Sequence, residues 1–109
     1  MLTQADKQHQ ILNIGGGTAG ITVAAQLLRK DPTLDVAILE PSEQHYYQPA
    51  WTLVGAGAFD LQETIRPEAD QIPEKATWIK AYAETIDPEA SVVVTRDGVA
   101  IGYQYLIVA

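Results

Sequence analysis

Gly15-Gly16-Gly17-Thr18-Ala19-Gly20 is the stretch that decides the fold of this chain. It fits the pattern G-x-G-x-x-G, which is informative only when a strand precedes it and a helix follows it. Residues 10–14 (QILNI) form a short apolar run typical of a buried strand. Residues 18–30 have apolar side chains near helical spacing and end before Asp31-Pro32. The stretch therefore has the strand–turn–helix context of a dinucleotide-binding fold.

The glycines of this turn have separate predicted roles. Gly15 permits the tight turn, and Gly17 lets the backbone approach a pyrophosphate that a Cβ would strike. Gly20 lets the helix pack closely on the first strand. The first helical turn, which includes Thr18 and Ala19, offers N–H groups and the positive end of the helix dipole to the phosphates. These residues are therefore predicted to bind a cofactor.

A carboxylate follows at the spacing that such a site requires. Residues 35–40 (DVAILE) form a second buried-type strand that ends at Glu40, 20 residues after Gly20. Glu40 can accept hydrogen bonds from the hydroxyls of an adenosine ribose and would repel a 2′-phosphate, which disfavours NADP. The alternative is a glycine-rich turn with an incidental surface glutamate. The order of strand, glycines, helix, strand and acid favours the nucleotide site.

Composition excludes several other classes of function. The chain has 109 residues, a formal net charge of −7 and no cysteine. The charge disfavours a nucleic-acid partner, and the missing thiols exclude a disulfide scaffold or a thiolate metal site. The two histidines, His9 and His45, lack a paired spacing, so no metal site is predicted. Because a signal peptide and a membrane-spanning run are also missing, the expected location is cytoplasmic.

The second half of the chain is predicted to form short helices and strands. Residues 51–57 suggest a helical turn, and Asp60 is expected to cap a helix that runs through Arg66 and ends at Pro67. Residues 76–86 are predicted as one strand. Residues 91–96 and 99–102 are predicted as a hairpin around Asp97-Gly98. Residues 105–109 (YLIVA) are predicted as another buried strand.

This layout resembles the first FAD-binding segment of flavoproteins that have two dinucleotide-binding domains. In those proteins a small antiparallel sheet interrupts the nucleotide fold before a strand of the type Y-x-x-L-I-x-A. The expected fold class is α/β: a Rossmann-like FAD-binding segment in which residues 10–14, 35–40 and 105–109 form a parallel sheet, with a small antiparallel β-meander. Residues 1–9 are expected to be a flexible tail, and residues 10–109 the N-terminal part of an FAD/NAD(P)-binding domain.

The loop of residues 45–57 (HYYQPAWTLVGAG) resembles the corresponding loop of the sulfide:quinone oxidoreductases more specifically. The resemblance to this family extends from about Ile11 to the end of the chain. In that family the loop lies near the flavin ring, which implies that Pro49 contacts the isoalloxazine. The resemblance implies FAD as the cofactor, sulfide and a membrane quinone as partners, and a full-length enzyme that is peripheral on the membrane. The family oxidises sulfide through cysteines that lie further along its chains. No catalytic residue is therefore predicted here.

The chain stops within an apolar run, so truncation is expected, and the piece alone is expected to be inactive. The strand edge of residues 105–109 would then be exposed, which makes a homo-oligomer plausible. The alternative function is a stand-alone NAD- or FAD-binding regulatory module without catalysis.

Other polar and aromatic residues have two interpretations each. His45 is either a proton relay or a solvated loop residue. Tyr46, Tyr47 and Trp51 either line a flavin or quinone pocket or form an aromatic cluster under a loop. Trp78 and Tyr82, at alternate strand positions, are expected in the core. The acids that are expected to form a solvated face are Glu63, Glu68, Asp70 and Glu74.

Overall fold

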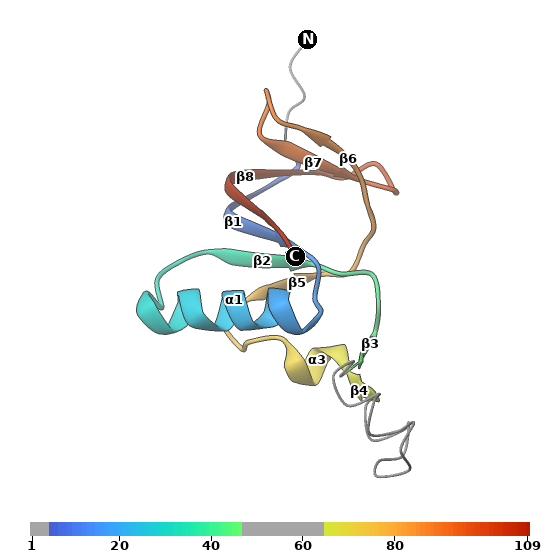
Figure 1. Ribbon diagram of the computed structural model, residues 1–109. Coiled ribbons are helices and arrows are strands. Elements are labelled where there is room, and N and C mark those ends of the chain that lie inside the picture. The colour runs from blue at the N-terminus through green and yellow to red at the C-terminus, as the bar shows by residue number, and fades with distance from the viewer. Residues whose placement is uncertain (1–4, 47–64) are drawn as a thin grey trace.

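The computed structural model describes residues 5–46 and 65–109 (Figure 1). Its elements in chain order are β1 (Lys7–Ile14), α1 (Thr18–Lys30), β2 (Val36–Leu39), β3 (Gln44–Tyr46), β4 (Ile65–Pro67), α3 (Glu68–Gln71), β5 (Thr77–Ile79), β6 (Ala83–Asp87), β7 (Val92–Thr95) and β8 (Ala100–Val108). One sheet has the strand order β5-β2-β1-β8-β7-β6, and β3 pairs with β4 separately. Strands β5, β2, β1 and β8 are parallel, whereas β7 and β6 are antiparallel. The predicted fold class is therefore confirmed.

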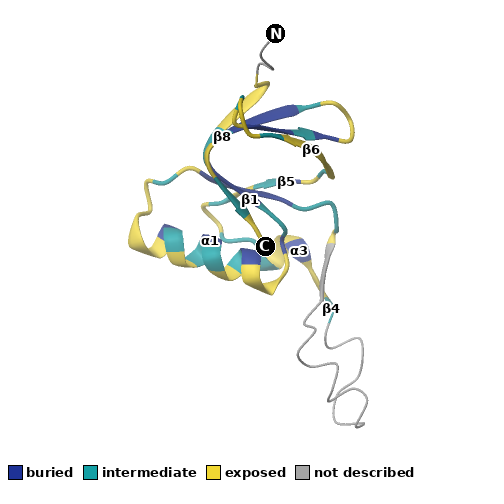
Figure 2. Ribbon diagram, turned by 45° about the horizontal axis from the view of Figure 1, so that its top comes forward, coloured by how far each residue is buried: buried dark blue, intermediate teal, exposed yellow. Residues whose placement is uncertain are grey.

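The molecule has three layers because the parallel strands are covered on both faces. Side chains alternate between the two faces of a strand. Accordingly, Val36 belongs to the core cluster that includes Ala24 of α1, and Ala37 belongs to the cluster that includes Val93 of β7. Figures 1 and 2 show α1 on one side of the parallel strands and the β6–β7 ribbon on the other. The α1 bounds agree with the prediction.

Strand β8 belongs to two layers. Its first residues pair antiparallel with β7, as in the predicted hairpin, while its whole length runs parallel to β1 up to the pair Ile14↔Val108. The prediction of two strands, 99–102 and 105–109, was wrong because the residues between them stay paired with β1. Likewise β1 begins at Lys7, so residues 7–9 belong to the sheet and not to the expected tail. This end of β1 is exposed, so its backbone pairing leaves no apolar pattern in the sequence.

Two other predicted elements differ from the structure. Residues 76–86 form two strands, since β5 pairs with β2 in the parallel layer and β6 pairs with β7 in the meander. Arg66 lies in strand β4 and not in a helix. Pro67 precedes the short helix α3, in keeping with the preference of proline for helix starts, where its missing N–H costs nothing. Residues 51–57 and Asp60 lie outside the described residues.

No helix within residues 5–46 and 65–109 has the length and apolar character needed to cross a bilayer.

Candidate functional site

The glycine turn, residues 15–20, lies where the carboxyl ends of three parallel strands meet. Strand β1 has β2 on one side and β8 on the other, so the strand order reverses at β1. The Gly15 N–H donates to the Leu39 carbonyl at 2.9 Å, and the Ala109 N–H donates to the Ile14 carbonyl at 3.0 Å. In open α/β sheets, ligands bind in the crevice outside the strands at such a reversal.

Two glycines of the turn are required by the protein's own geometry. Gly15 has a φ of +113°, and a Cβ on it would lie 2.7 Å from the Ala109 carbonyl oxygen. A Cβ on Gly20 would lie 2.0 Å from the Gly15 carbonyl oxygen. The same Cβ would lie 3.3 Å from Nδ2 of Asn13 in β1. Helix α1 therefore packs closely against both the turn and the end of the first strand, in keeping with the predicted role of Gly20.

Gly17 differs because, among the residues that the structure describes, no atom beyond its chain neighbours lies within 4 Å of the position that its Cβ would take. Its φ of −74° is one that any residue adopts. Packing and backbone conformation within the described residues therefore give no reason for a glycine here, whereas a group bound from outside would.

The start of α1 suits an anion. The residue before the helix, Gly17, makes no side-chain cap, and the first turn, which holds Thr18 and Ala19, contains no acidic residue. The first N–H groups of a helix have no partner within the helix and carry its positive dipole end. Together with the open space at Gly17, this geometry fits the pyrophosphate of a dinucleotide.

Glu40 lies directly beside the glycine turn, at the end of β2. Its Oε1 accepts the Gly16 N–H at 2.9 Å, and its Oε2 accepts the Ser42 N–H at 3.0 Å. Its backbone is held as well, because the Trp78 indole donates to the Glu40 carbonyl at 3.0 Å. An ionised carboxylate has about four acceptor sites, so these two hydrogen bonds leave capacity for ribose hydroxyls. Trp78, expected in the core, is only half-buried and supports this residue.

Glu68 was missed by the sequence analysis, which placed it on a solvated face. It is 1% exposed, whereas Asp70 and Glu74 are exposed as predicted. Its Oε2 lies 3.1 Å from the position of a Cβ on Gly16. Burial, and secondly the charge of Glu40, raise the pKa of Glu68 to about 7. Pro67 followed by acidic residues is a helix-start signal that could have located α3, but no sequence signal indicated the burial.

Asn13 was also missed. It is fully buried near the end of β1, and its Nδ2 donates to the Gly20 carbonyl at 2.7 Å. This hydrogen bond ties the strand before the turn to the helix after it. An asparagine inside an apolar run is the signal that could have identified it, because buried amides need partners.

Several other predicted residues either lie outside the described residues or are placed elsewhere by the structure. Pro49, Tyr47, Trp51 and Glu63 lie outside the described residues, and for His45 and Tyr46 the structure describes only their backbone in β3. Tyr82 is not in the core: it is 51% exposed, with the Arg96 guanidinium 4.1 Å from its ring centroid. His9 bonds Asp35, with 2.9 Å between Nδ1 and Oδ1. Within the described ranges no three metal-binding side chains cluster.

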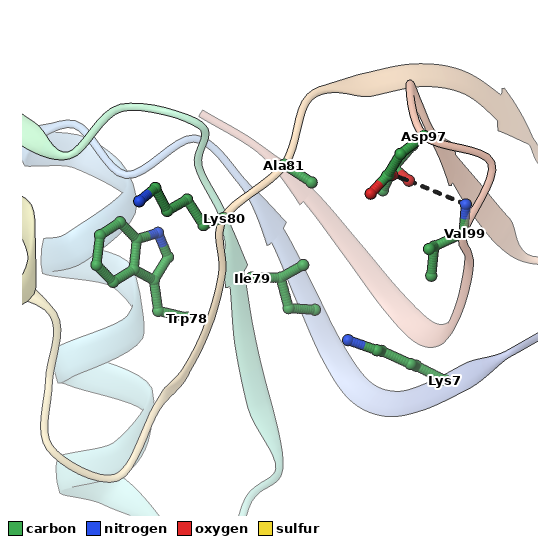
Figure 3. Close-up of a pocket in the computed structure, with 8 residues that line it drawn as sticks. Lys7, Trp78, Ile79, Lys80, Ala81, Asp97 and Val99 are labelled. Atoms are coloured by element: carbon green, nitrogen blue, oxygen red, sulfur yellow. Dashed lines mark hydrogen bonds between the residues drawn. The ribbon is translucent and has the colours of Figure 1, made fainter.

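A separate pocket of about 190 Å³ lies between the end of β5 and the β7–β8 hairpin, away from the glycine turn (Figure 3). Its lining residues are Lys7, Trp78, Ile79, Lys80, Ala81, Thr95, Asp97 and Val99. Lys80 forms an ion pair with Glu43, and the Val99 N–H donates to the Thr95 hydroxyl at 3.1 Å. None of the residues of the glycine turn lines this pocket.

Comparison with known proteins gives consistent results. No family model matches the chain. The chain is 46% identical over 101 residues to the mitochondrial sulfide:quinone oxidoreductase of Dictyostelium discoideum. The aligned stretch covers 92% of this chain and 22% of that protein. For the enzyme of the same name from Mus musculus the identity is 42% over 105 residues, covering 96% of this chain and 23% of that protein.

The structure is similar to the crystal structure of the sulfide:quinone oxidoreductase from Aquifex aeolicus, with a TM-score of 0.77 and 27% identity. That match covers 94% of this chain and 24% of the bacterial one. The chain thus spans about a quarter of the length of these relatives. Over the stretch compared, the chain is similar to sulfide:quinone oxidoreductases in both sequence and structure.

Proposed function

We propose that the chain is the FAD-binding segment of a flavoprotein that oxidises sulfide and reduces a quinone. The observation that carries the proposal is the open space at Gly17, in a glycine turn at the reversal of strand order. Gly17 directly precedes the first turn of α1, and the Glu40 carboxylate accepts the N–H of the neighbouring Gly16. The proposal for the substrates is supported by the names of the relatives.

Each residue of the turn would hold a different part of FAD. Gly15, Gly17 and the N–H groups of Thr18, Ala19 and Gly20 would bind the pyrophosphate. Glu40 would bind the adenosine ribose, and Pro49 would contact the isoalloxazine ring. Bound FAD would supply the two-electron redox chemistry, and this chain would orient it.

The partners of the full-length protein follow from the same proposal. Sulfide would be the electron donor and a membrane quinone the acceptor, which favours peripheral attachment to a membrane over a purely cytoplasmic location. Nucleic acid is not a proposed partner, given the net charge of −7. This chain has no cysteine to take up sulfide sulfur, so we assign it no catalytic residue and expect it to be inactive alone.

The test uses the purified full-length protein under anaerobic conditions. Its flavin absorbance is expected to bleach on addition of sulfide and to return on addition of a short-chain quinone. The same protein stripped of FAD is the control, and it should consume neither sulfide nor quinone. Flavin that stays oxidised in sulfide would refute the proposed substrate. Nucleotide binding without any electron transfer would favour the alternative, a regulatory module that binds NAD or FAD.

A further inference from the structure

We propose that Glu68 is a positioning residue of the nucleotide site, through which the short helix α3 sets the position of Gly16 and Glu40. The inference rests on the proposed function, because it concerns the same glycine turn. It adds a residue from a distant part of the chain and a dependence of nucleotide affinity on pH.

The geometry places two carboxyl groups against one backbone residue. Gly16 is buried, and a Cβ on it would lie 2.8 Å from the Glu40 Cγ and 3.1 Å from the Glu68 Oε2. Glu40 also accepts the Gly16 N–H. Gly16 is therefore enclosed by Glu40 from the end of β2 and by Glu68 from α3. A change in the position or charge of Glu68 would therefore act directly beside Gly16 and Glu40.

The anchoring of α3 explains why Glu68 is held in this place. The Glu68 N–H donates to the Glu43 carbonyl at 2.7 Å, and the Glu68 carbonyl accepts the Ile72 N–H at 3.1 Å. The side chain is 1% exposed. A carboxyl group fixed in so little water is costly to ionise.

Charge then couples this residue to the ligand. Its neighbour Glu40 is an acid, and a bound dinucleotide would bring the negative pyrophosphate to the same turn. Both charges favour the neutral form of Glu68, whose pKa is already raised to about 7 in the ligand-free protein. Nucleotide binding and proton binding at Glu68 therefore favour each other, and affinity must fall as pH rises through this pKa.

Other charged residues near α3 either pair with groups other than Glu68, or their effect on the pH dependence can be distinguished by mutation. The Glu43 side chain pairs with Lys80, and the Arg66 guanidinium donates to the Ile65 carbonyl at 3.1 Å. Asp70 lies on α3 itself and is exposed. Strand β3 also carries a histidine, His45, and a His45→Gln variant separates any contribution from it.

The experiment measures FAD affinity of the full-length apoprotein by flavin fluorescence from pH 5.5 to 8.5. The wild-type Kd is expected to increase above pH 7, by at most about tenfold per pH unit for one coupled proton. Glu68→Gln mimics the neutral acid, so its Kd should match the wild type at pH 5.5 and stay flat as pH rises. Asp70→Asn, on the same helix but exposed, and His45→Gln should both follow the wild-type curve.

Glu68→Ala provides a second readout, because it opens space beside Gly16. It should bind FAD more weakly at every pH, while glutamine restores binding. A Glu68→Gln variant that keeps the wild-type pH dependence, or a wild-type affinity that does not change with pH, would overturn the inference and leave the proposed function intact. Failure of the wild type to bind FAD at any pH would overturn both.

Discussion

Gly20 and Gly17 stand three residues apart in the same turn, but the protein needs them for different reasons. Gly20→Ala places a Cβ 2.0 Å from the Gly15 carbonyl oxygen, a backbone atom that cannot move away cheaply. We expect it to lower the free energy of unfolding by about 1–3 kcal/mol, as overpacking does. Gly17→Ala adds a methyl group in open space and should cost less than about 1 kcal/mol. Urea denaturation of both variants checks this, and equal losses would contradict it.

Glu40 both holds the turn and would hold the ribose. We expect Glu40→Ala to weaken FAD binding by about 1–3 kcal/mol, the typical cost of losing a charged hydrogen-bond partner. Equilibrium titration of the full-length apoprotein with FAD measures the change. Glu43→Ala is the matched control, since its exposed ion pair with Lys80 is worth little. An unchanged affinity in Glu40→Ala would show that the acid is incidental.

Glu68 also predicts how the stability of the apoprotein depends on pH. Its pKa is about 7 in the folded protein against an ordinary value of 4.5, so the folded state binds more protons between these values. Stability from this group is therefore full below about pH 4.5, falls as pH rises to 7 and is constant above, with a loss of about 1–3 kcal/mol.

Chemical denaturation at pH 5 and pH 8 measures that loss. Glu68→Gln should remove this part of the pH dependence and be more stable than the wild type at pH 8. Asp70→Asn should keep the wild-type dependence. A Glu68→Gln protein that loses as much stability as the wild type between the two pH values would rule out this role.

The residues of the candidate site were predicted unequally. The glycines and Glu40 could be proposed from the sequence because a nucleotide site requires those residue types at fixed spacing. Asn13 and Glu68 were missed because their importance comes from burial. Glu68 lies in a run of acids that is typical of a solvated face, and only the packing of α3 beside Gly16 distinguishes it.

Among the elements, α1 and the core of β1 and β2 were predicted well because strong apolar periodicity and the stop at Asp31-Pro32 define them. The ends of strands, and the points where one strand stops and the next begins, were predicted less well. Residues 76–86 keep an extended pattern across the change of layer, so the sequence does not reveal that β5 and β6 pair with different strands. Likewise, nothing in the sequence indicates that β8 continues through Tyr103, where pairing with β1 maintains it.

The β7–β8 hairpin depends on the conformation of Gly98, whose φ is +88°. An added Cβ there would meet no atom of residues 5–46 or 65–109 within 4 Å beyond its chain neighbours, so we attribute the cost of a substitution to backbone strain. We expect Gly98→Ala to lower the free energy of unfolding by about 1–2 kcal/mol, the penalty for an ordinary residue at positive φ. Gly98→Asn should lose less, because asparagine tolerates that region. Identical losses in the two variants would mean that strain is not the cause.

At the scale of the whole molecule, the layers bring together the glycine turn, the start of α1 and Glu40, which we propose as the adenosine and pyrophosphate half of a nucleotide site. Binding must offset the entropy of fixing a long, flexible cofactor, and half a site offers fewer contacts to do so. We therefore expect the 109-residue chain alone to bind FAD weakly or not at all, and to show no sulfide-dependent quinone reduction. Titration with FAD and a coupled quinone assay test this. Tight stoichiometric binding would show that the chain holds a complete site.

The central claim is that the glycine turn binds the pyrophosphate of FAD, and the flavin content of the full-length Gly17→Val variant tests it most directly. The fold tolerates the change because the space at Gly17 is open, whereas a bound pyrophosphate would collide with the side chain. Thr22→Val, exposed further along α1, is the matched control. We predict a folded, flavin-free Gly17→Val protein beside a flavin-replete control. Normal flavin absorbance in Gly17→Val would contradict the account.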